Sequence, residues 1–254
     1  ALFLPTMAAT AWYHRKMPAD LQSQSLQAVV AQAEAFAANE YTLALFKGRS
    51  LAGEARQRIV SQVARFTGVS EKFVERCDLR IDDSRYYTEL LRDQGKTIGR
   101  LDSRFTGQDR DSAGELALTD PARSNLLGAC ATAFNHYMRE TLAYVSDSPY
   151  TIMTSLYKTW GWGDYKNKYA SVSDKLREAM QANPHLQVLI ASGYFDLATP
   201  HFATDYTIDH LRIGAQLRNN IAVKYYEAGH MMYIHKPSLA SLSEDLRAFI
   251  IRSQ

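Results

Sequence analysis

Two ionisable side chains, Asp196 and His230, each follow an apolar run that ends at a glycine-containing turn. The run at 188–191 breaks at a Ser-Gly pair before Asp196, and the run at 221–226 breaks at Glu-Ala-Gly before His230. Short apolar runs bounded by turn residues indicate buried strands. Open α/β sheets place their chemistry beyond the carboxyl ends of such strands. A carboxylate that orients an imidazole there is the acid–base part of a nucleophilic hydrolase site.

Other interpretations of these side chains are open. Asp196 could be a structural turn residue, because Asp is common after strands. Asp205 and Asp209 are rival acids, but they lie farther along a predicted helix and would reach the strand end less directly. His230 could be a loop histidine with a structural hydrogen bond. A zinc site is not expected, because His230 and His235 are five positions apart with no acidic or thiol ligand in helical register.

The strands that position the pair belong to the last part of the chain. The sequence predicts a helix that is capped within 171–174 and reaches Ala182, a helix at 202–211 and a last helix that begins at Pro237. A connection is predicted at 214–218, a short strand at 150–157 and a turn at 160–163, whose Trp160 and Trp162 are interpreted as packing residues.

The first 150 residues or so are predicted to be helix after helix. Residues 94–114 are expected to form an irregular loop, with a short strand at 100–105. Asp120 is expected to cap a helix, with Pro121 at its first position and an apolar stripe on its buried side. The expected helices cover residues 5–16, 21–46, 52–66, 71–77, 84–92 and 120–145, and the stripe comprises Leu126, Leu127, Cys130, Phe134, Tyr137, Met138 and Leu142.

Composition limits the classes of function. Of 254 residues, 46% are hydrophobic, which is ordinary for a globular protein. With 29 Lys and Arg against 27 Asp and Glu, no basic face is implied, and no nucleic-acid motif is present. No apolar run approaches the length of a membrane span. Cys77 and Cys130 could form a disulfide or stay as two inert thiols.

Two segments around the ionisable pair resemble a known family. Residues 192–200, S-G-Y-F-D-L-A-T-P, are similar to the serine carboxypeptidase segment S-G-x-x-D-x-x-x-P, and 227–231, E-A-G-H-M, resemble its G-H-M segment. The opening residues 4–14 resemble the stretch where the bacterial branch of that family enters a helical cap. The resemblance covers most of the chain.

The resemblance implies an α/β fold, namely the C-terminal portion of an α/β-hydrolase core preceded by a large helical cap. Residues 1–16 would be the end of the core and a lead-in helix, 17–150 the helical cap, and 151–254 the C-terminal part of the core. Asp196 would be the catalytic acid, His230 the general base and Met231 a substrate-binding residue. No cofactor or metal is implied, and a periplasmic or secreted location is favoured.

The nucleophile of that family lies in a G-x-S-x-G elbow, and this sequence has none. Gly68-Val69-Ser70 is followed by Glu71-Lys72 rather than by a second glycine. We therefore expect a serine-type carboxypeptidase in which this chain supplies Asp and His and is inactive alone. Its expected partners are a peptide substrate and either the N-terminal half of the same enzyme or a second copy of the chain.

Two parallel strands are too few for a stable sheet. We expect a bare patch that includes Leu189, Val223 and Tyr225, and a chain that is not a free-standing monomer. The absence of methionine at position 1 suits a segment of a longer protein. The alternative function is a non-catalytic peptide- or protein-binding module derived from an α/β-hydrolase.

Overall fold

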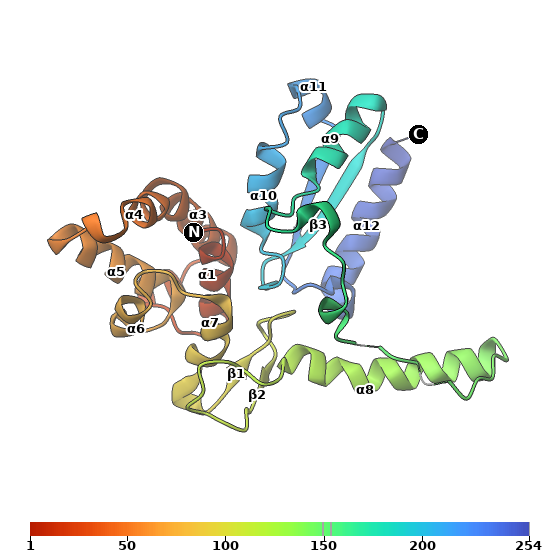
Figure 1. Cartoon of the computed structure of the whole chain (residues 1–254), viewed down its shortest axis with the longest axis horizontal. Coiled ribbons are helices and arrows are strands. Elements are labelled where there is room, and N and C mark those ends of the chain that lie inside the picture. The colour runs from red at the N-terminus through yellow and green to blue at the C-terminus, as the bar shows by residue number, and fades with distance from the viewer. Residues whose placement is uncertain (149, 153, 254) are drawn as a thin grey trace.

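The computed structural model describes residues 1–148, 150–152 and 154–253, and it joins a helical part to a smaller part built on two parallel strands (Figure 1). The chain is 56% helical and 6% strand, so the mixed helix-and-strand class is observed. In the helical part the elements are α1 Leu4–Tyr13, α2 Ala19–Gln22, α3 Leu26–Phe36, a π-helical turn Ala37–Tyr41, α4 Thr42–Lys47, a 3-10 turn Gly48–Ser50, α5 Gly53–Thr67, α6 Glu71–Arg76, α7 Asp83–Glu89 and a 3-10 turn Arg92–Gln94.

Helix α1 lies at the centre of the helical part. Its residues from Leu4 to Ala11 are all buried, and it packs against α3 and α5. Small side chains let the neighbouring helices approach closely, since Ala8, Ala9 and Ala11 are 0% exposed. Pro5 lies in the first turn, where its missing N–H costs nothing.

The helix expected at 21–46 begins later than predicted, at Leu26, and α3, the π-helical turn and α4 then follow one another without a gap to Lys47. The chain breaks after α2, and Ser25 begins α3 by accepting a hydrogen bond from the Ala28 amide at 3.3 Å. A serine at this position satisfies an otherwise unpaired amide of the first turn, so it favours a new helix start over continuation. Asp20, in α2, pairs with Arg65 on α5.

The strand expected at 100–105 is also wrong. Strands β1 Thr97–Ile98 and β2 Thr106–Gly107 pair antiparallel, and residues 100–105 form the loop between them. The Asp102 carboxylate accepts a hydrogen bond from the Arg104 amide at 3.1 Å. That side-chain-to-backbone bond stabilises a turn in place of a strand.

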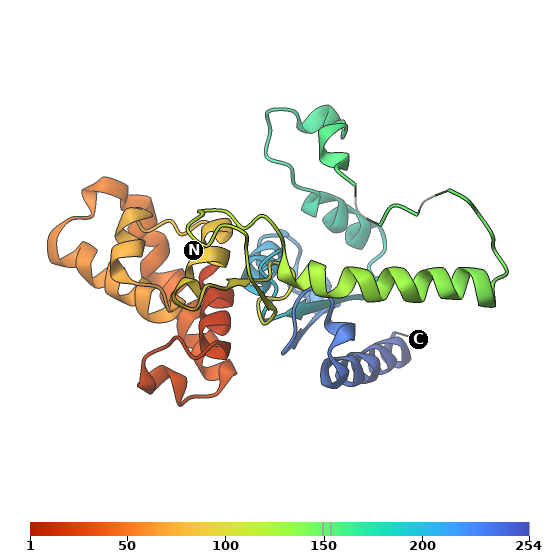
Figure 2. The same cartoon turned by 90° about the horizontal axis from the view of Figure 1, so that it is seen from below.

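Helix α8 Pro121–His136, followed by a π-helical turn Tyr137–Thr141, projects away from the rest of the molecule (Figures 1 and 2). Asp120 caps it as predicted, accepting from the Ala122 amide at 3.0 Å. The predicted buried stripe is wrong. Leu127, Tyr137 and Leu142 are 36%, 51% and 52% exposed.

The segment after α8 also departs from expectation. Described residues between 150 and 157 form no strand; Met153 of that prediction lies outside the described residues, and a 3-10 turn covers Leu156–Lys158. Trp160 and Trp162 are 62% and 56% exposed, so their interpretation as packing residues is wrong. A 3-10 turn Gly163–Tyr165 and helix α9 Ser173–Ala182 follow.

Strands β3 Val188–Gly193 and β4 Ile221–Tyr226 pair in parallel, with Val188 opposite Ile221 and Gly193 opposite Tyr226. Side chains of α9 and of helix α10 His201–Asp209 pack on one face of the pair. The chain then forms α11 Ala215–Arg218, a 3-10 turn Met232–Ile234 and α12 Lys236–Arg252. Asp245 of α12 binds Lys224 and the Tyr226 hydroxyl, at 2.8 and 2.9 Å.

This parallel pair is incompletely covered. Within the described residues β3 and β4 pair only with each other, so each has a free edge. Tyr225 is 40% exposed, whereas Leu189 and Val223 are half-buried, so the expected bare patch is present in part. Parallel strands are normally buried on both faces.

The solvent-accessible surface of the chain, 15848 Å², is large for its mass of 28.6 kDa. A compact monomer of this mass exposes about 11,000 Å². The excess includes apolar side chains on α8, at 160–169 and on α12. Within the described residues, no helix is long and apolar enough to cross a membrane.

Candidate active site

The turn after β3 brings Asp196 to the carboxyl end of the parallel pair. The backbone is very close to its neighbours here, because a Cβ on Gly193 would lie 2.4 Å from the carbonyl oxygens of Ala228 and Gly229. Only glycine fits this approach. The Phe195 amide then donates to the Ala228 carbonyl at 3.0 Å, which holds the turn after β3 against the turn after β4.

Asp196 is 3% exposed, and its carboxylate makes four hydrogen-bond contacts. Its Oδ1 accepts from the amides of Ala198 and Thr199, at 2.8 and 3.0 Å. Its Oδ2 accepts from the Thr199 hydroxyl at 2.5 Å and faces His230 Nδ1 at 2.8 Å. A carboxylate held on both oxygens has a fixed orientation toward its imidazole partner.

His230 completes the pair on which the sequence interpretation depends, and the expected hydrogen bond is present. With the proton on Nδ1 directed at Asp196, the lone pair of Nε2 is available. The side chain is 44% exposed, and no described residue hydrogen-bonds Nε2. An imidazole oriented at one nitrogen and open at the other can accept a proton from a nucleophile.

Thr199 belongs to this arrangement and was not singled out from the sequence. Its hydroxyl donates to Asp196 Oδ2 and lies 3.3 Å from His230 Nδ1. Because the hydroxyl proton is used by Asp196, the Thr199 oxygen is free to accept from Nδ1–H. The sequence feature that could have identified Thr199 is its position three residues after Asp196, from which a hydroxyl can hydrogen-bond the carboxylate.

The loop 100–104 contacts both turns and was also missed. Ser103 donates its amide to the Phe195 carbonyl at 3.0 Å, and Leu197 donates its amide to the Arg100 carbonyl at 3.1 Å. The His230 amide donates to the Leu101 carbonyl at 2.7 Å. These residues precede the acid by more than 90 positions, so no local pattern points to them.

The other residues considered from the sequence have partners of their own. Met231 follows His230 and is half-buried, whereas Met232 packs with Tyr226 and Ala228. The rival acid Asp205 binds the Tyr225 hydroxyl at 2.6 Å, and burial raises the pKa of its carboxyl.

Asp209 lies 3.7 Å from Arg218, and His235 is bonded to the Ser238 hydroxyl at 2.8 Å. Neither residue contacts His230. No cluster of three or more metal-ligating side chains occurs in the described residues.

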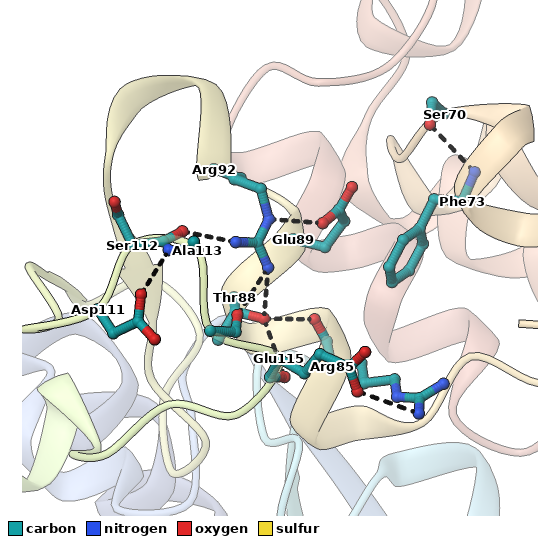
Figure 3. Close-up of polar contacts among 11 residues, drawn as sticks. Ser70, Phe73, Arg85, Thr88, Glu89, Arg92, Asp111, Ser112, Ala113 and Glu115 are labelled. Atoms are coloured by element: carbon teal, nitrogen blue, oxygen red, sulfur yellow. Dashed lines mark hydrogen bonds and ion pairs between the residues drawn. The ribbon is translucent and has the colours of Figure 1, made fainter. Parts of the chain in front are cut away.

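No serine in the described part of the chain is placed as a nucleophile. The Ser70 hydroxyl accepts a hydrogen bond from the Phe73 amide at 3.2 Å and so begins helix α6 (Figure 3). The hydroxyl that reaches His230 belongs to Thr199 and lies on the Nδ1 side of the ring. The chain therefore holds an acid and a base with an open position beside Nε2.

A second concave feature lies in the helical part, away from this pair. It is a cleft of about 600 Å³ whose lining includes Phe73, Cys77, Arg85 and Arg92. The Arg92 guanidinium bonds the Glu89 carboxylate at 2.7 Å and the carbonyls of Ser112 and Gly114 at 2.5 and 2.9 Å (Figure 3). Arg92 thus holds the 112–114 loop on α7 and is engaged in structure.

Both thiols are free. Cys77 is buried in the helical part, burial raises the pKa of its thiol, and Cys130 lies exposed on α8. A thiol with a raised pKa carries less thiolate, so Cys77 suits a packing role.

Comparisons of the chain with protein-family models, with curated proteins and with solved structures find no match.

Proposed function

We propose that this chain supplies the acid and the general base of a serine-type carboxypeptidase, which hydrolyses C-terminal peptide bonds through an acyl-enzyme. The observation that supports the proposal is the 2.8 Å contact between Asp196 Oδ2 and His230 Nδ1, with Nε2 open to solvent. The two motif segments contain this same pair of residues, so geometry and resemblance select the same side chains.

In this proposal His230 Nε2 takes the proton of a serine hydroxyl as the serine attacks the scissile carbonyl. The imidazolium then returns the proton to the leaving amine. Asp196 keeps the ring in the productive tautomer and stabilises its charged form, and it stays unprotonated. Thr199 and the Ala198 amide fix the carboxylate while the charge on the ring changes.

The serine and the oxyanion-hole amides must come from polypeptide outside these 254 residues, because they contain no G-x-S-x-G elbow. The free edges of β3 and β4 and the excess of exposed surface are consistent with such an addition. The added strands would extend the parallel pair into the sheet of an α/β-hydrolase, and the helical part would be its cap.

A binding module for a peptide or a protein is the alternative function. The apolar side of α8 supports it, because Leu127, Tyr137 and Leu142 are exposed on a projecting helix. Contiguous exposed apolar surface marks interaction sites. This alternative requires neither a serine nor a free Nε2.

The test is to tag the chain at its native locus and purify the protein or complex to which it belongs. The purified material is assayed for release of C-terminal amino acids from N-blocked dipeptides and for labelling by a fluorophosphonate. We expect hydrolysis and a labelled serine outside residues 1–254. The isolated chain should be inactive, because loss of the nucleophile alone removes about a million-fold of catalysis in a well-characterised serine protease.

Three variants sharpen this test. His230→Ala and Asp196→Asn should each lower kcat on the order of 10⁴-fold or more. Asp209→Asn removes an exposed carboxylate of the neighbouring helix and should leave activity unchanged. Material that binds peptides without hydrolysing them, and that ignores the first two substitutions, would establish the binding module instead.

A further inference from the structure

Asp102, in the loop between β1 and β2, is a buried acid that contacts the turn carrying the histidine. It is 1% exposed, and its Oδ2 accepts a hydrogen bond from the Gly229 amide at 3.1 Å. Gly229 directly precedes His230. The next amide along, that of His230 itself, donates to the Leu101 carbonyl at 2.7 Å. Two consecutive amides of the histidine turn are thus held by two consecutive residues of one loop.

Arg104 keeps the Asp102 carboxylate in place. Its Nε lies 2.9 Å from Asp102 Oδ1 and its Nη2 lies 2.6 Å from Oδ2. Its Nη1 donates to the Glu227 carbonyl at 2.7 Å, so the guanidinium also binds the start of the histidine turn. Its Cζ lies 5.2 Å from the centre of the ring of Phe195, the residue that precedes Asp196. A bidentate arginine–carboxylate pair of this kind has a specific geometry that lysine cannot reproduce.

The fit between loop and turn leaves no room for adjustment. A Cβ on Gly229 would lie 2.4 Å from Asp102 Cβ and 2.4 Å from the Leu101 carbonyl oxygen. The backbone of the histidine turn therefore rests directly on the loop. The same loop is tied to helix α1, since the Ser103 hydroxyl lies 2.7 Å from that of Thr10 and the Ser103 carbonyl lies 2.7 Å from His14 Nε2.

We infer that Asp102 is a positioning residue for His230. The pair Asp102–Arg104 fixes the position of the His230 ring relative to the Asp196 carboxylate. The inference rests on the proposed function. Asp102 touches neither the ring nor Asp196, and it acts through the Gly229 amide and through Arg104. Without the carboxylate, the buried Gly229 amide loses its partner and Arg104 loses two of its three acceptors. The turn is then free to shift, and the ring shifts with it.

The geometry can be tested on the isolated chain by NMR. In the wild type, the Nδ1 proton of His230 should give a downfield signal, assigned by its loss in His230→Gln. Asp102→Ala and Asp102→Asn should weaken or remove that signal, while the melt stays cooperative. Asp93→Asn, which removes an exposed carboxylate paired with Lys16, is the matched control and should leave the signal in place.

Arg104→Lys provides a second variant if the Asp102 variants do not fold. It keeps Asp102 and the positive charge but loses the bidentate contact, so the downfield signal should be weaker than in the wild type. In the purified active protein, Asp102→Asn should lower kcat on the order of 100-fold with little change in KM, since a small displacement of a catalytic group has that size of effect.

The outcomes separate the inference from the function on which it rests. A wild-type chain without the downfield signal contradicts the proposed acid–histidine site. If the signal persists at wild-type strength in folded Asp102→Ala, or in Arg104→Lys where that variant is needed, the positioning role alone is overturned. A folded Asp102→Asn enzyme with wild-type kcat would overturn it as well.

Discussion

His201 Nε2 lies 3.0 Å from Glu34 Oε1, which joins α10 to α3 across 167 positions of the sequence. The other ring nitrogen of His201 lies 3.1 Å from the hydroxyl of Thr6 on α1. His201 is 0% exposed and begins the helix that follows the Asp196 turn. One imidazole therefore connects the helical part to the segment that carries the acid.

Replacing His201 should destabilise the fold strongly. His201→Ala leaves the buried Thr6 hydroxyl without this partner and creates a cavity, so we expect a loss of about 2–4 kcal/mol in the free energy of unfolding. Urea denaturation measures it. Glu34→Gln keeps an acceptor for the ring and should cost less than about 1 kcal/mol. Equal costs for the two variants would contradict the role assigned to the buried ring.

The close approach at Gly229 gives a second prediction. Gly229→Ala should lower stability by about 1–3 kcal/mol, because the new methyl group overlaps Asp102 and Leu101. Gly128→Ala is the matched control, since a Cβ there meets nothing within 4 Å and the position is inside helix α8. That control should raise stability by up to about 1 kcal/mol. A neutral Gly229→Ala would show that loop and turn can separate freely.

The pH dependence of stability should include a contribution from His14. Burial, the largest cause, lowers the pKa of its imidazole, and Lys16 and Lys96 lower it further, against a hydrogen bond to Ser103 that raises it. The unfolded chain therefore binds a proton at this site more readily than the folded one. This contribution is fully present above about pH 6.5 and is lost as the pH falls toward the lower pKa of the folded state.

A His14→Gln variant isolates that effect, because glutamine can still donate to the Ser103 carbonyl and does not titrate. Melting temperatures of both proteins are compared between about pH 7.5 and about pH 5.5, a range that spans the ordinary pKa of histidine. The wild type should lose more stability over this range than the variant does. Parallel curves would show that His14 titrates alike in the folded and unfolded chain.

The isolated chain should associate with itself. Its apolar surface on α12 includes Leu246 and Ile250, 42% and 55% exposed, and unpaired strand edges invite further pairing. Sedimentation velocity should detect dimers or larger species at micromolar concentration. Ile250→Glu should reduce association without lowering the melting temperature, whereas Glu244→Gln on the same helix should not. A monodisperse wild-type monomer would contradict this expectation.

Arg92 offers a last prediction in the helical part. Arg92→Ala removes the bonds to the carbonyls of Ser112 and Gly114, so the 112–114 loop should separate from α7. Trypsin should then cut at Arg110 faster than in the wild type. Arg123→Ala, an exposed change on α8, is the control and should not alter the rate at Arg110.

Patterns within a few residues are sufficient to predict the strands that carry Asp196 and His230. Apolar runs of strand length ending in glycine predicted β3 and β4, and the acid and histidine follow them as expected. The cap at Asp120 could be predicted for the same reason, because aspartate followed by proline acts within one turn of helix. In each case the deciding interactions lie within a few residues.

Contacts between distant segments could not be read in the same way. The loop 100–104 looks irregular in sequence because its partners are Phe195, Leu197 and His230. The periodicity of α8 predicts a buried stripe, but helical spacing shows only that one face is apolar and not which polypeptide covers it. The prediction that Trp160 and Trp162 are packing residues is wrong for the same reason.

The loop 100–104 also constrains how this molecule could be re-engineered. It belongs to the helical part in sequence, yet its amides, carbonyls and one carboxylate support both turns of the candidate site. Exchanging the helical part as a whole would therefore remove part of the scaffold under the imidazole. A graft that keeps residues 97–107, together with Thr10 and His14, which bond Ser103, would keep that scaffold.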